Sequence, residues 1–267
     1  MKEFYKRCIH IYDQYRESVP SYASVAFAFY LLLILIPAAS LVAVGTSFLN
    51  IDMSIIEEII RQMIMPEYAN YIIEILDTRT FDTVALVTIV VSLYTVSRGV
   101  RHIDLIARNM YQYQTDESIV SYYIYSFKIT IILLLLFIGL IAVLAIGPLA
   151  YVFHFLYHFY GIRHIILFFL VVLCLMIIYK IVPRVHIHYE DAFEGALVSS
   201  TLMLILYYAL NIYFEFAHFQ SVYGPLAFIV AILFVLNWAA EVFYIGMYMT
   251  HMLHERRKEN EERTSRN

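Results

Sequence analysis

The sequence predicts an all-α membrane protein, a polytopic bundle of six transmembrane helices with amphipathic helices at the membrane interfaces. Hydrophobic residues make up 62% of the 267 residues and charged residues only 15%. Soluble domains are about half apolar and about one quarter charged. The apolar residues also gather in blocks, several of them longer than the roughly 18 residues that mark a membrane span.

The apolar blocks place the spans and divide the chain. We expect spans at residues 22–49, 83–96, 125–155, 164–182, 192–216 and 223–253, of which the second is the shortest. The whole chain, 1–267, is then a single integral membrane domain. It consists of an interfacial helix over 1–21, the six-span bundle over 22–253 and a polar tail over 254–267.

Lysine and arginine orient these spans. With six spans, 15 of the 18 basic residues fall on the side of the two termini and 3 on the opposite side. Basic residues concentrate on the cytoplasmic side of membrane proteins. Both termini are therefore predicted to be cytoplasmic.

Several segments between the spans read as amphipathic helices. Residues 4–15 place aromatic and aliphatic side chains on one helical face, as an interfacial helix does. Residues 54–76 read as two short helices broken at Pro66. The SRGVR segment is expected to end the second span, and a basic amphipathic helix is expected to follow it on the cytoplasmic surface.

Charge, cysteines and motifs exclude several classes of protein. A net charge of −4 argues against a nucleic-acid-binding surface. Cys8 and Cys174 lie too far apart to indicate a disulfide framework. The sequence has no phosphate-binding glycine loop, GxSxG, HExxH or CxxC motif. We therefore expect no enzymatic activity and no cofactor.

The segment KIVPRVHIHYEDAFEGA could hold a metal. His186, His188 and Glu190 alternate, so a strand would present all three on one side, and imidazole and carboxylate suit zinc. No further ligand accompanies them at a diagnostic spacing.

A turn at the membrane surface accounts for more of the same segment. Pro183 would stop span four. Asp191 would cap span five, with Glu194 as its capping-box partner. Gly195 would let the helix approach a neighbour closely. We favour this interpretation and predict no metal ligands.

Two pairs of polar residues lie inside predicted spans. A charged side chain there is energetically unfavourable, so each carboxylate is a candidate functional residue. In each pair a carboxylate follows an amide by four residues, which puts both on one helical face. The pairs are Asn211 with Glu215 in span five and Asn237 with Glu241 in span six.

Glu241 is the main candidate site. Counted from Tyr223, it falls in the cytoplasmic half of span six. Its expected partner is Arg98 or Arg101, at the cytoplasmic end of span two. The alternative to a structural ion pair is a carboxylate that handles protons or substrate.

Four blocks of the chain resemble the YihY/virulence factor BrkB family of bacterial inner-membrane proteins. They are AFYLLLILIPAASL, SLYTVSRGVRHIDLIARNMY, IVPRVHIHYEDAFEGALV and VYGPLAFIVAILFVLNWAAEVFYIG. Departures from the family pattern are Tyr94 and Val235 in place of tryptophans and Tyr248 in place of a glutamate. The residues that match it are Tyr30, Pro37, Ser97, Gly99, Asn109, Tyr111, Pro183, Asp191, Gly195, Tyr223, Gly224 and Gly246.

The resemblance implies a multi-pass protein of the bacterial plasma membrane. Some members of this family are linked to serum resistance, some are described as transporters, and many carry a ribonuclease label that no motif here supports. Three hypotheses follow: a transporter or lipid-handling protein of the cell envelope, a non-transporting scaffold, and an enzyme. Membrane lipids are the expected partners, and the oligomeric state is left open.

Overall fold

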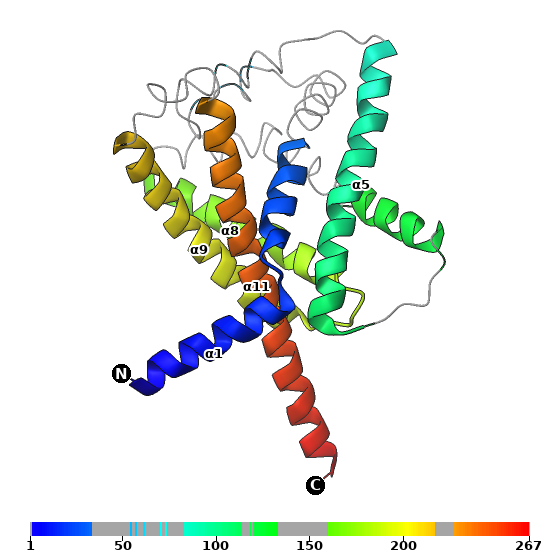
Figure 1. Cartoon of the computed structure of the whole chain (residues 1–267), viewed down its shortest axis with the longest axis vertical. Coiled ribbons are helices and arrows are strands. Elements are labelled where there is room, and N and C mark those ends of the chain that lie inside the picture. Colours follow the sequence, from blue (N-terminus) through cyan, green and yellow to red (C-terminus); the bar gives the residue numbers. More distant parts are fainter. Residues whose placement is uncertain are drawn as a thin grey trace. The chain divides into compact units, whose positions relative to one another are not determined.

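The computed structural model describes residues 2–33, 83–113, 120–132, 160–216 and 227–266, with a few single residues between these ranges. Every regular element in these ranges is a helix (Figure 1). The labelled helices are α1 (Lys2–Ser18), α5 (Thr83–Tyr111), α8 (Tyr160–Ile181), α9 (Tyr189–Phe216) and α11 (Ala227–Arg266). A shorter apolar helix spans Tyr22–Leu33, and another covers residues 120–132.

The all-α prediction is therefore confirmed for the described residues. Two helical stretches among them are long and apolar enough to cross a membrane, Tyr189–Tyr213 and Val230–Arg266. Most of spans one and three and the segment around Pro66 lie outside the described residues. Six spans and cytoplasmic termini stay predictions.

By its internal contacts the chain divides into two compact units. That the whole chain, 1–267, forms one integral membrane domain stays a prediction. Helix α5 contributes to both units. The first unit, which holds the sites described below, consists of Met1–Phe29, Val100–Ser118 and His164–Asn267; the second consists of Tyr30–Gly99 and Ile119–Arg163.

Helix α5 joins the predicted second span to the amphipathic helix expected after it. SRGVR lies inside α5, which runs unbroken for 29 residues through Gly99. Beyond Gly99 the side chains of Ile103, Ile106, Ala107 and Met110 are buried, at the spacing of one helical face. Burial of that face offsets the roughly 1 kcal/mol that a glycine costs inside a helix.

Helix α11 also exceeds its prediction. Residues 254–266, expected as a polar tail, continue the helix to Arg266. The sequence HERRKENEERTSR contains neither glycine nor proline and is rich in strong helix formers. The polar end of α11 is therefore a rigid extension of the apolar part.

Small residues bring α9 and α11 together. In the first half of α9, Ala192, Gly195, Ala196, Ser199 and Ser200 are buried and share one helical face. Short side chains let two helix backbones approach closely, as in membrane helix pairs. The resulting contact between α9 and α11 is called the small-residue seam below.

Two glycines have no room for a side chain in this seam. A Cβ atom on Gly246 would overlap the Ser199 hydroxyl and lie 2.8 Å from the Gly195 carbonyl oxygen. A Cβ atom on Gly195 would overlap the Thr250 hydroxyl and lie 2.7 Å from the Gly246 carbonyl oxygen. Both are far inside van der Waals contact.

Helix α8 completes the seam through a buried tyrosine. Tyr179 is fully buried, and its hydroxyl donates to the Phe243 carbonyl of α11 at 2.8 Å. The Ser199 hydroxyl of α9 donates to the neighbouring Val242 carbonyl at 2.9 Å. These two bonds fix α8 and α9 to the same turn of α11.

Burial is uneven along α9 and α11. Six of the ten residues from 191 to 200 are buried, but none from 201 to 213. Likewise, only Ala231 is buried between residues 230 and 239 of α11, whereas eight of the eleven residues from 240 to 250 are buried. The close backbone approach lies at the N-terminal half of α9. Towards its C-terminal end, α9 contacts α11 through large side chains, because the rings of Tyr213 and Phe234 stack with their centroids 5.7 Å apart.

Replacing either seam glycine by alanine should force the helices apart. Overpacking a tight core costs about 1–3 kcal/mol, so Gly195→Ala and Gly246→Ala should each lower the midpoint of thermal unfolding in detergent. Ala209→Val adds bulk to an exposed position of the same helix and should leave the midpoint unchanged. Equal midpoints for all four forms would contradict the close approach of α9 and α11.

Candidate functional site

Glu241, on α11, is held by three donors from the N-terminal part of the chain. The Arg16 guanidinium lies 2.9 Å from one carboxylate oxygen. The Tyr15 hydroxyl donates to that same oxygen at 3.1 Å, and the Ser24 hydroxyl donates to the other. All of these residues belong to the first unit.

The Glu241 site combines charge pairing with partial burial. The side chains of Glu241 and Arg16 are 19% and 32% exposed. Burial, and after it the neighbouring Glu241 charge, raises the pKa of Tyr15, so this phenol stays protonated and remains a donor. The carboxylate thus has a cation and two hydroxyl donors, which a charge in an apolar helix requires.

Apolar and aromatic packing holds the donors in place. Tyr15 contacts Tyr248 edge to face, with ring centroids 5.5 Å apart. Phe27 packs against Phe243 and Tyr244 at 5.1 and 5.7 Å. Both α1 and the helix Tyr22–Leu33 are therefore packed against the turns of α11 that follow Glu241.

The break between α1 and the helix Tyr22–Leu33 places the donors on both sides of it near Glu241. Pro20 disfavours helical backbone at Val19, so α1 ends at Ser18. Val19 is fully buried, and its amide donates to the Tyr15 carbonyl at 2.7 Å. Helix α5 supports the turn, because Asn109 Nδ2 donates to the Ser18 carbonyl at 2.8 Å.

A cation that pairs with Glu241 is Arg16, which was not among the expected partners Arg98 and Arg101. Arg98 instead lies over the ring of Tyr94, with its guanidinium carbon 5.9 Å from the ring centroid. Arg16 and Glu241 lie at opposite ends of the chain, and no spacing rule links them.

The other polar residues of the spans have different environments. Asn237 lies one turn before Glu241, and its Oδ1 atom is buried without a hydrogen-bond partner. Asn211 lies on the half of α9 that has no buried residues, and the side chain of Glu215 is outside the described residues. Asn237 therefore adds a buried polar atom one helical turn from Glu241.

A second carboxylate, Asp104 on α5, was missed by the sequence analysis. It is almost fully buried, at 1% exposure. Arg108 Nε and the Tyr113 hydroxyl donate to it at 3.0 and 3.1 Å, and Arg184 Nε lies 3.6 Å away. Its sequence context, on the polar face of a basic amphipathic helix, pointed to solvent rather than to a buried ion-pair cluster.

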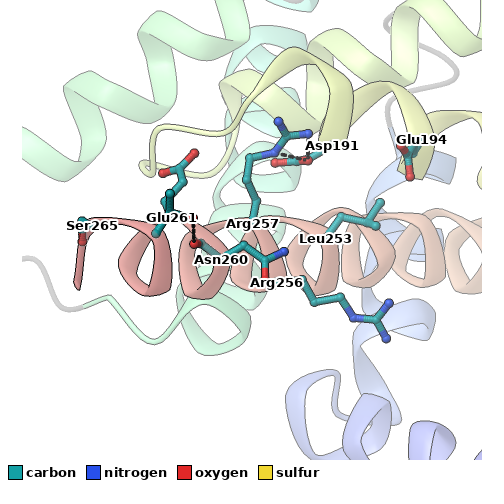
Figure 2. Close-up of a pocket in the computed structure, with 9 residues that line it drawn as sticks. Asp191, Glu194, Leu253, Arg256, Arg257, Asn260, Glu261 and Ser265 are labelled. Carbon is teal, nitrogen blue, oxygen red and sulfur yellow. Dashed lines mark hydrogen bonds and ion pairs between the residues drawn. The ribbon is translucent and has the colours of Figure 1, made fainter. Parts of the chain in front are cut away.

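The start of α9 corrects the predicted cap. The helix begins at Tyr189, so Asp191 lies in its first turn rather than at its N-cap. Asp191 is buried and accepts from Arg257 Nε at 3.0 Å (Figure 2). Glu190 accepts from Arg257 Nη2 at 2.7 Å. An open groove of about 700 Å³ runs beside this contact, between the first turns of α9 and the end of α11.

The loop before α9 ends α8 as predicted, at Ile181, two residues before the buried Pro183. His186 and His188 are exposed in this loop, with ring centroids 5.9 Å apart. Glu190 points to Arg257 instead of joining them. In the part of the chain that the structure describes, no three His, Cys, Asp or Glu side chains are placed to hold a metal ion.

The residues that carried the family resemblance fall in several places. Gly195 and Gly246 form the seam, Asn109 binds the turn after α1, and Asp191 binds Arg257. Gly99 is buried within α5, and Tyr30 is half-buried in the helix Tyr22–Leu33. Pro37, Tyr223 and Gly224 lie outside the described residues.

In the part of the chain that the structure describes, every regular element is a helix, and two helical stretches are long and apolar enough to cross a membrane, as in an integral membrane protein. The model of the family "Virulence factor BrkB" matches residues 11–267, nearly the whole chain, and the protein belongs to this family. No curated protein and no solved structure matches this chain.

Asp104→Asn should strongly destabilise the protein, because it removes the buried negative charge beside Arg108 and Arg184. Breaking a buried ion pair from one side typically costs about 3–5 kcal/mol. The measurement is unfolding in a denaturing detergent titration. Asp13→Asn, an exposed change on α1, serves as the control. A loss no larger than that of the control would show that the Asp104 cluster is not structural.

Proposed function

We propose that this membrane protein is a transporter or lipid-handling protein for an amphiphile of the bacterial cell envelope. In this proposal it lies in the plasma membrane with both termini in the cytoplasm and carries no enzymatic activity. The observation that carries the proposal is the Glu241 site, a carboxylate within an apolar helix that is tied to α1 by Arg16 and Tyr15.

The Glu241 contacts suit a gate better than a static support. Each donor is a side chain on α1 or just after it, so α1 can detach from α11 without breaking any backbone hydrogen bond within the helices. Hydrogen bonds and ion pairs that connect rigid helices can exist in two arrangements, which is the requirement for switching. Glu241 would hold α1 closed until a ligand or proton competes with Arg16.

The uneven burial supports the same proposal. Under the proposed orientation, the small-residue seam closes the cytoplasmic halves of α9 and α11, whereas their outer halves are less buried and meet through the stacked rings of Tyr213 and Phe234. The outer halves expose large apolar side chains such as Leu204, Ile205 and Trp238. A protein that is closed on the cytoplasmic side and open to lipid on the other could admit an amphiphile sideways from the membrane.

The scaffold hypothesis has one observation in its favour. The seam, with two glycines that cannot accept a Cβ atom, is typical of permanent helix packing. A scaffold would use the same packing without any movement of α1. It would also keep a stable protein partner in mild detergent.

Native mass spectrometry of the protein purified in mild detergent tests the proposal. Wild type should retain a specific lipid or lipid precursor, and Glu241→Gln should lose it because the amide lacks the negative charge for which the ligand competes with Arg16. Glu262→Gln makes the same chemical change at an exposed position of α11 and should retain the lipid. Identical bulk phospholipids in all three forms would contradict lipid handling and favour the scaffold.

A further inference from the structure

The Arg16 guanidinium lies in a cage of two aromatic rings and one carboxylate. Its central carbon is 5.3 Å from the ring centroid of Tyr12 and 5.3 Å from that of Tyr15. Glu241 closes the third side at 2.9 Å, and Arg16 Nε donates to the Tyr12 hydroxyl at 3.1 Å. Aromatic faces around a carboxylate bind alkylammonium groups as well as guanidinium. These three side chains are called the cation cage below.

An acidic hollow adjoins the cation cage. Its volume is about 400 Å³, and Tyr248, whose ring packs against Tyr15 of the cage, forms part of its wall. Its charged lining residues are Glu17, Glu255, Glu259 and Arg256, so acids outnumber bases by three to one. Clefts lined by one sign of charge concentrate ligands of the opposite sign. A cation, rather than an anion, is favoured at the cage.

Apolar surface also lies close to the cage. Val25, directly after Ser24, is 62% exposed, and Trp238, one turn before Glu241 on α11, is 48% exposed. In a membrane protein such side chains contact lipid tails. An amphiphile bound through its headgroup at Glu241 would find apolar side chains for its tail on both neighbouring helices.

We propose that the cation cage is a binding site for the alkylammonium headgroup of a membrane amphiphile, and that Arg16 occupies it from within the chain. The proposal rests on the proposed function and names the headgroup class for the same site. An incoming ammonium group would take the place of the guanidinium between Tyr12, Tyr15 and Glu241. Displaced Arg16 would then no longer hold α1 against α11, so binding and release of α1 would be coupled.

Self-occupancy makes a quantitative prediction. When a side chain of the protein occupies the site, the apparent affinity for a ligand equals the intrinsic affinity multiplied by the fraction of molecules in which the site is free. Removing the occupant should therefore strengthen binding. Hexyltrimethylammonium is a suitable probe, hexyl sulfate is its anionic counterpart, and the fluorescence of Trp238, the only tryptophan in the chain, reports on the site.

In lipid nanodiscs, Arg16→Ala should bind hexyltrimethylammonium at least about tenfold more tightly than wild type does. The double variant Arg16→Ala with Glu241→Gln should lose this gain, and hexyl sulfate should not respond to either change. Lys6→Ala removes one exposed positive charge from the same helix and should bind the probe as wild type does. Arg16→Gln keeps most of the side chain's length and gives the same test if Arg16→Ala does not fold.

Three results would overturn the assignment: no gain in either Arg16 variant, an equal gain in Lys6→Ala, or equal binding of hexyl sulfate. Its failure is separable from that of the proposed function. Lipid retention that depends on Glu241, without any preference for the ammonium probe, would remove only the headgroup assignment. Tight binding of the probe without lipid retention would leave the cage assigned and contradict lipid handling.

Discussion

A carboxylate within an apolar helix must be neutralised, and the way Glu241 meets that requirement organises this protein. Charge in a membrane-spanning helix is unfavourable by several kcal/mol unless it is paired or reaches water. The chain supplies a cation from α1 and two hydroxyls from the residues around its break at Pro20. The N-terminal helix is thus fixed to the last helix of the chain by a site that neither helix could satisfy alone.

Helix α11 packs against α1 with one face, while its other face packs against α8 and α9. Gly246 and Thr250 face the small residues of α9, and Phe243 accepts the Tyr179 hydroxyl of α8. These contacts have little freedom, since a single added methyl group would overlap a neighbouring atom. The Glu241 contacts consist of side chains that can separate and re-form. A rigid face and a releasable face on one helix are what a gated membrane protein would use.

The sequence predicted those features that depend on local patterns. Long apolar runs placed α8 and α9 within a few residues of their observed bounds, and Pro183 marked the end of α8. Gly195 and Gly246 were singled out by their family pattern, and they form the seam. The carboxylate at Glu241 was recognised because a charge within an apolar run is conspicuous.

The partners of those residues could not be predicted, because pairing between distant helices leaves no periodic signal. Arg16 lies in an amphipathic helix where an arginine suits the membrane surface equally well. Asp104 looked solvated because its neighbours Arg101 and Arg108 are basic, whereas the fold buries it against Arg184 from a distant loop. The second span and the amphipathic helix after it were predicted separately, whereas one buried face continues past Gly99 and makes them a single helix.

Hydrogen exchange of α1 tests the central claim most directly. Amide exchange of residues 2–18 would be compared in wild type, Arg16→Ala, Glu241→Gln and the double variant. If the ion pair holds α1 on α11, each single change should speed exchange and the double change should add little more, as expected for coupled residues. Unchanged exchange in Glu241→Gln, or independent and additive increases from the two changes, would contradict the account.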